Sequence, residues 1–96
     1  MFKPLDPLLH NQLRLAIISL LINVDSAEFK FLLEQTQASR GNLSVQISKL
    51  KDAGYISVKK SFRNNYPLTT CRISQKGVQA FETYVERIEA YLKKNS

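Results

Sequence analysis

Apolar residues recur at helical spacing over the first third of the chain. The spacing predicts a helix over residues 6–22, with Asp6 as its cap and Pro7 at its first helical position. A short second helix is predicted over residues 28–36, with a minimal strand near residues 26–28 before it. In the first helix, one face is shared by Leu9, Leu13, Ile17, Leu20 and Leu21; in the second, Phe29, Leu32 and Leu33 are directed inward.

A third helix is predicted over residues 39–53. Ser39 is suited to cap its N-terminus, and Gly54 stands where a left-handed residue ends a helix. Leu43, Ile47 and Leu50 share one stripe of this helix. The helices over 28–36 and 39–53, joined by a tight connection, therefore have the order of a helix-turn-helix motif.

The pattern changes to alternation after Gly54. Residues 55–62 and 68–73 read as two strands of a hairpin, with residues 63–67 as its turn and Pro67 as a block to central-strand pairing. Ser74 then caps a long final helix, whose apolar positions are Val78, Phe81, Val85, Ile88 and Leu92. The predicted fold is mainly α with a small β-hairpin: a winged helix-turn-helix forming one domain over residues 1–96.

Positive charge is concentrated in the middle of the chain. Residues 39–76 carry eight basic side chains and a single acid, Asp52, whereas the segments on either side are close to neutral. The formal net charge of +6 therefore comes from this middle segment, which starts with the third helix. This asymmetry favours a binding surface for a polyanion over evenly scattered lysines.

The exposed face of the third helix bears short or amide side chains, which permit close approach to bases. An ordinary solvated face explains such a surface equally well when the helix is taken alone, but the basic hairpin beside it favours DNA. The predicted recognition-helix residues are Ser39, Arg40, Asn42, Ser44, Val45, Gln46 and Lys49, and the predicted wing residues are Lys59, Lys60, Arg63, Asn64, Asn65 and Arg72.

Catalytic and metal-binding patterns are missing from the sequence. His10 is the only histidine, Cys71 is the only cysteine, and neither belongs to a cluster with metal-ligand spacing. There is no Gly-rich phosphate loop and no nucleophile motif, so we expect a non-enzyme without cofactor or metal. No apolar run approaches the ~18 residues of a membrane span, and the N-terminus lacks signal-peptide features, so we expect a cytoplasmic protein.

The chain resembles stand-alone bacterial or archaeal winged-helix transcriptional regulators of the ArsR/MarR type. The resemblance is carried by "LDPLLHNQLRLAIISLL", "GNLSVQISKLKDAGYISVKKSF" and "PLTTCRISQKG". It implies that the Asn-Leu-Ser helix docks in the major groove, that the hairpin reaches flanking DNA, and that terminal helices form a dimer. The turn "RNNYPL" lacks the glycine and paired arginines common in relatives, and Cys71 replaces an aromatic residue, which leaves a thiol-sensing role open.

The terminal segments carry more apolar surface than one small core covers, which favours a C2 homodimer. The predicted interface residues are Leu5, Leu8, Leu9, Tyr84, Ile88, Tyr91 and Leu92. The sequence thus predicts a dimeric regulator that binds a pseudo-palindromic site in double-stranded DNA. The alternatives are a winged-helix adaptor that binds an acidic protein, or an RNA-binding winged helix. The operator, the target genes, the effector and the sign of regulation stay open.

Overall fold

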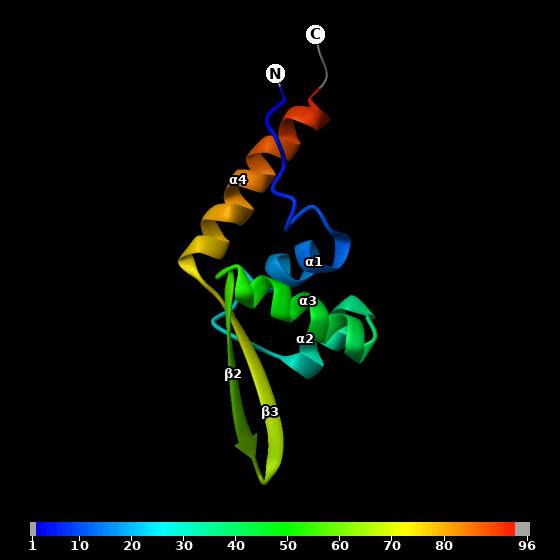
Figure 1. Ribbon diagram of the computed structural model, residues 1–96, viewed down its shortest axis with the longest axis vertical. Helices are drawn as coiled ribbons and strands as arrows, with labels where there is room; N and C mark the ends of the chain where they lie inside the picture. Colours follow the sequence, from blue (N-terminus) through cyan, green and yellow to red (C-terminus); the bar gives the residue numbers. More distant parts are fainter. Residues whose placement is uncertain (1, 94–96) are drawn as a thin grey trace.

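The computed structural model describes residues 2–93 and has three parts along its 59 Å length (Figure 1). Three short helices form the middle, a β-hairpin extends from one end, and a long helix extends from the other. The elements in chain order are α1 (Gln12–Leu21), β1 (Ala27–Glu28), α2 (Phe29–Thr36), α3 (Arg40–Asp52), β2 (Ile56–Arg63), β3 (Tyr66–Ile73) and α4 (Gln75–Leu92). The prediction of a mainly helical winged fold is confirmed.

The core lies where the three short helices meet the base of the sheet. Apolar stripes of α1, α2 and α3 converge there, as their helical spacing predicts. Within residues 2–93, no polar or charged side chain is buried in this core. Its fully buried side chains are Leu9, Ile17, Ile18, Leu21, Leu32, Leu43, Leu50 and Cys71.

The first helix begins later than predicted, at Gln12 rather than near Asp6. Asp6 still acts as a cap, but of a turn: its carboxylate accepts the N–H of Leu8 at 2.9 Å, and its carbonyl accepts that of His10. Asn11 then takes an extended conformation, and its side chain accepts the N–H of Arg14 at 3.0 Å. Two capping residues compete along this segment, and the later one starts the helix.

The predicted ends of α3 are confirmed. Ser39 accepts the N–H of Asn42 through its hydroxyl, and Gly54 has a φ of +81°. The N–H groups of Gly54 and Tyr55 donate to the carbonyls of Lys51 and Leu50, which is the Schellman pattern. This ending turns the chain sharply from α3 into β2.

The sheet is antiparallel, with the strand order β1-β3-β2. Asn64 and Asn65 have φ values of 50° and 66°, which fit a two-residue hairpin turn of type I′. The second strand of the hairpin, β3, begins at Tyr66, so the expectation that it starts at Leu68 is wrong. Pro67 is tolerated because it pairs with Phe62 beyond the reach of β1, where its missing N–H faces no third strand.

The last helix is fixed to the hairpin base through Ser74. The Ser74 hydroxyl accepts the N–H of Gly77 at 3.0 Å and donates to the carbonyl of Gly54 at 2.6 Å, and its own N–H donates to the carbonyl of Tyr55. The predicted cap is confirmed. It also joins the start of α4 to the end of α3.

Candidate nucleic-acid interface

The outward face of α3 is open to solvent. Ser39, Arg40, Asn42, Ser44 and Lys49 are exposed, whereas Leu43, Ile47 and Leu50 are buried on the opposite stripe. Val45 is 50% exposed, which is high for an aliphatic side chain at the centre of a helix. The helix therefore offers small and polar groups in its first turns, where recognition helices contact base edges.

Gln46 differs from the other candidates because it is half-buried and both the oxygen and the nitrogen of its amide form hydrogen bonds within the protein. Its amide oxygen accepts a hydrogen bond from the Arg14 guanidinium, and its amide nitrogen donates to Oδ1 of Asn42 at 3.0 Å. Arg14 also donates through Nε to the carbonyl of Leu8 at 2.6 Å. The predicted pair Asn42 and Gln46 is thus linked to α1.

A groove of about 450 Å³ lies between α3 and the wing. Its apolar floor comes from Phe29, Ile47 and Val58. Its rim carries the cations of Arg40, Lys51 and Lys60, and none of the described residues that line it is acidic. The polar residues between them are Ser44, Ser48 and Thr69. Such a groove attracts an anionic chain that runs alongside the helix.

The strand register separates the wing cations onto two faces. Lys60 pairs with Thr69 and shares the face of Val58 and Cys71, which is the side of α3. Lys59 pairs with Thr70 and shares the other face with Arg72. The sequence predicts Lys59 and Lys60 together as wing residues that contact DNA, but alternation along the strand places them on opposite faces.

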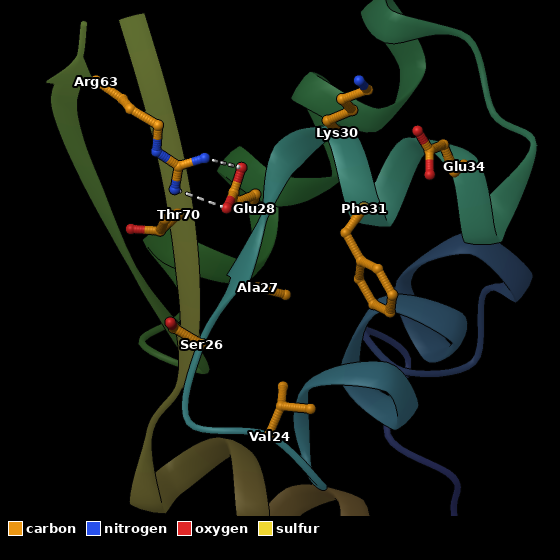
Figure 2. A pocket seen from close by; sticks show the side chains of 9 residues that line it. All are labelled: Val24, Ser26, Ala27, Glu28, Lys30, Phe31, Glu34, Arg63 and Thr70. Carbon is orange, nitrogen blue, oxygen red and sulfur yellow. Dashed lines mark hydrogen bonds and ion pairs between the residues drawn. The ribbon is translucent and has the colours of Figure 1, made fainter.

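Arg63 lies near the tip of the hairpin and forms an ion pair with Glu28, at 2.9 Å between Nη2 and Oε2 (Figure 2). The pair borders a shallow hollow of about 630 Å³ whose wall includes Phe31 and Val24. The Arg63 side chain remains 61% exposed, and exposed pairs contribute at most about 1 kcal/mol. A phosphate can therefore compete for this guanidinium.

The wing also carries two exposed aromatic residues that lie outside the predicted DNA-binding set. Phe62 and Tyr66 are 76% and 75% exposed, and they stand on opposite faces of the hairpin near Asn64 and Asn65. The length of the two hairpin strands could have indicated these exposed residues, because β2 and β3 continue well past the positions that cover the core. Lys51 was missed as well, because its place in the groove depends on the wing's position.

The terminal residues predicted to form a dimer interface divide into two groups. Leu9 and Tyr84 are buried within the single chain, so they belong to its own core and offer no surface to a second copy. Leu5, Leu8 and Ile88 are half-buried, and Tyr91 and Leu92 are exposed. Covering Leu9 and Tyr84 required the N-terminal segment to fold back, which helical periodicity does not predict.

The N-terminal segment runs alongside α4 toward its far end (Figure 1). Phe2 stacks on Tyr91 with ring centroids 4.6 Å apart, and Arg87 donates to the carbonyl of Pro4 at 2.8 Å. His10 lies 3.1 Å from the hydroxyl of Tyr84. One face of α4 is therefore covered by the chain's own first residues.

The adjacent face of α4 has an apolar stripe with alternating three- and four-residue spacing. Phe81 and Ile88 are half-buried against the chain's own core, whereas Leu92 is 75% exposed. This spacing is typical of a helix that packs along a second helix. The stripe consists of Val78, Phe81, Val85, Ile88 and Leu92.

The remaining reactive groups are protected. Burial raises the pKa of the Cys71 thiol to about 11, which leaves little thiolate at neutral pH. Burial and a hydrogen bond to Asp6, strengthened by the carboxylate charge, raise the pKa of Tyr55 to about 12.

Across residues 2–93, no cluster of three or more His, Cys, Asp or Glu side chains is arranged to hold a metal ion. In the same range, no helix combines the length and apolarity needed to cross a membrane.

Comparisons with known proteins agree with this fold. The chain is 33% identical over 75 residues to the uncharacterized protein MJ0432 of Methanocaldococcus jannaschii, which covers 78% of this chain and 82% of that protein. Its fold matches a transcriptional regulator homologue of Pyrococcus horikoshii with a TM-score of 0.82 and 24% identity, covering 88% of this chain and 84% of the other. YusO of Bacillus subtilis matches with a TM-score of 0.71 and 11% identity, covering 92% of this chain and 58% of that one.

The sequence profile of winged helix DNA-binding domains matches residues 13–92, from the start of α1 to the end of α4. The match therefore includes the helix-turn-helix, the wing and the final helix. It confirms the resemblance to winged-helix regulators. The chain belongs to the winged helix DNA-binding domain family and has the fold of DNA-binding transcriptional regulators.

Proposed function

We propose that this protein is a homodimeric transcriptional regulator that binds a specific, pseudo-palindromic site in double-stranded DNA. In this proposal α3 enters the major groove and the wing follows the adjacent backbone. Two copies related by a two-fold axis read half-sites about 34 Å apart, one turn of the duplex. Asn42, Ser44 and Val45 lie toward the bases, while the cations around them lie toward phosphates.

The observation that carries the proposal is the groove between α3 and the wing. Arg40, Lys51 and Lys60 surround it from two different elements, and none of the described residues that line it is acidic. The first turn of α3 adds its unpaired backbone N–H groups and the positive end of the helix dipole. An anionic strand seated there meets favourable charge along its length.

The two-sided wing supplies a sharp test. Lys60 borders the groove, whereas Lys59, one residue earlier, lies on the opposite face. Lys60→Gln and Lys59→Gln remove the same charge at neighbouring positions. We expect Lys60→Gln to weaken duplex binding more, and to reduce the slope of log affinity against log salt by about 0.9, the value for one lost phosphate contact.

The measurement is fluorescence anisotropy with a labelled duplex across a salt series. The expected result is an affinity that falls steeply with salt, with the larger loss for Lys60→Gln. An affinity independent of salt overturns DNA binding itself. Equal effects of the two substitutions overturn the placement of the wing. Stronger binding to acidic peptides or to RNA than to duplex DNA identifies the adaptor or RNA-binding alternative instead.

The homodimer part of the proposal is supported by α4. Its covered face is occupied by the chain's own N-terminal segment, while the stripe of Val78, Phe81, Val85, Ile88 and Leu92 retains apolar exposure. A second copy of α4 presents the same stripe, as an isologous interface requires. We therefore place the interface on this stripe rather than on Leu9 and Tyr84.

A further inference from the structure

Arg14, a cation outside the predicted DNA-binding residues, contacts α3. It lies on α1, outside the helix-turn-helix, yet its guanidinium reaches the amide of Gln46 on α3. Its other contact is with the carbonyl of Leu8, in the segment that precedes α1. The side chain is thus held between a fixed backbone acceptor and the recognition helix.

Arg14, Gln46 and Asn42 are linked by two successive hydrogen bonds, and the chemistry of the groups fixes the direction of both. A guanidinium can only donate, so the Gln46 atom that meets it must be the amide oxygen. The Gln46 amide nitrogen therefore faces Asn42, and the Asn42 atom that receives its hydrogen must be Oδ1. The orientations of both amides follow from one obligate donor.

This arrangement determines what α3 presents to solvent. The Asn42 Oδ1 atom is turned toward Gln46, where one of its two lone pairs is used, whereas the Asn42 Nδ2 group on the other side of the amide has no acceptor among the described residues. Asn42 is exposed in the first turn of α3. Asn42 thus directs its N–H donors away from Gln46. A free Asn or Gln amide, which can present a donor and an acceptor side by side, suits adenine instead.

We propose that Arg14 is a positioning residue that makes Asn42 a donor, and that the base pair read by Asn42 presents the acceptor edge of guanine. Guanine exposes two neighbouring acceptors in the major groove, N7 and O6, whereas adenine sets an amino donor beside N7 and thymine offers the single acceptor O4. The inference rests on the proposed function and specifies its base preference. This preference for guanine replaces the bidentate recognition of adenine that an Asn or Gln side chain suggests when it is considered alone.

The decisive substitution is Arg14→Glu, which exchanges an obligate donor for an obligate acceptor. Gln46 must then donate to the new carboxylate and turn its oxygen toward Asn42. Asn42 follows, so that Oδ1 faces the base and favours the amino groups of adenine or cytosine. Gln46→Glu is a second route to the same reversal, because Arg14 stays in place and Asn42 meets an acceptor.

Arg87→Glu is the matched control. Arg87 also donates to a carbonyl of the N-terminal segment, that of Pro4, but it lies on α4 and has no hydrogen bond to α3 among the described residues. Its reversal changes the net charge by the same amount. We expect it to weaken binding to all duplexes alike, without a change in base preference.

The experiment first selects preferred duplexes from a randomised library with the unaltered protein, and then maps the base pair whose preference is lost in Asn42→Ala. At that pair we expect the unaltered protein to prefer guanine by about tenfold. Arg14→Glu and Gln46→Glu should reverse the preference, and Arg14→Lys, which keeps a donor, should retain it. Circular dichroism confirms that each variant is folded.

The outcomes separate the two proposals. If the unaltered protein fails to bind duplex DNA, the proposed function is wrong. If it binds with a preference that Arg14→Glu and Gln46→Glu leave unchanged, the function stands and the positioning role of Arg14 is wrong. A preference for adenine in the unaltered protein also overturns the inference.

Discussion

At the scale of single residues, Gly77 shows how closely α4 approaches the α3–β2 junction. A Cβ atom added at Gly77 would lie 2.2 Å from the carbonyl oxygen of Tyr55 and 2.9 Å from Cγ1 of Ile73. Backbone cannot yield as a flexible side chain does, so the start of α4 must move. The glycine is required for packing rather than for its backbone angles.

We therefore expect Gly77→Ala to lower the free energy of unfolding by about 1–3 kcal/mol, the usual range for overpacking. Gly41→Ala is the control, because nothing lies within 4 Å of a Cβ added there. Replacing this helical glycine should raise stability by about 0.5–1 kcal/mol. Urea unfolding followed by circular dichroism measures both, and a neutral Gly77→Ala would contradict the close approach.

At the scale of elements, α4 has two apolar faces: one is covered by the chain's own N-terminal segment, and the other is the proposed homodimer interface. Tyr84 and Tyr91 contact the chain's own N-terminal segment, whereas the half-buried Val85 belongs to the apolar stripe on the adjacent face. We expect Val85→Asp to convert the proposed dimer into a monomer, because a carboxylate would then lie desolvated against its own copy. Glu86→Ala, on the exposed side of the helix, should leave the dimer intact.

Sedimentation equilibrium measures the mass of both variants, and circular dichroism confirms that α4 stays folded. We also expect the Val85→Asp monomer to bind an isolated half-site but to lose the added affinity for a full palindrome. An unaltered protein that is monomeric at all concentrations, or a Val85→Asp variant that stays dimeric, would place the interface elsewhere.

At the scale of the whole molecule, the hydrogen bond from Tyr55 to Asp6 joins its distant parts. Tyr55 follows Gly54 at the end of α3, and Asp6 organises the turn before α1. The pKa of Tyr55 in the folded protein, about 12, exceeds its ordinary value of 10.0. The protonated phenol is therefore favoured in the folded state, and its stabilising contribution is complete below about pH 10.

As the pH rises from about 10 through about 12, this contribution should disappear. The comparison is the free energy of unfolding of the unaltered protein against Tyr55→Phe, which keeps the ring but cannot ionise. The difference should be constant below about pH 10 and should shrink above it. A difference that does not change with alkaline pH would show that the link contributes no stability.

Features governed by local interactions were predicted correctly from the sequence. Ser39, Gly54 and Ser74 act within a few residues of themselves, so their roles as helix caps follow from residue type and spacing. The small polar face of α3 follows from helical geometry in the same way. The first helix was misplaced because Asp6 and Asn11 are both good caps, and the pattern gives no means to choose between them.

The sequence by itself determined the order of elements, the inward stripes, and the concentration of positive charge in the middle of the chain. Only the tertiary structure decided that Leu9 and Tyr84 are core residues, that Lys59 and Lys60 lie on opposite faces, and that Arg14 reaches α3. The physical reason is the distance along the sequence over which each interaction acts. Caps and periodic stripes depend on neighbours within a few positions, whereas burial, strand register and the Arg14–Gln46 contact depend on where distant segments meet.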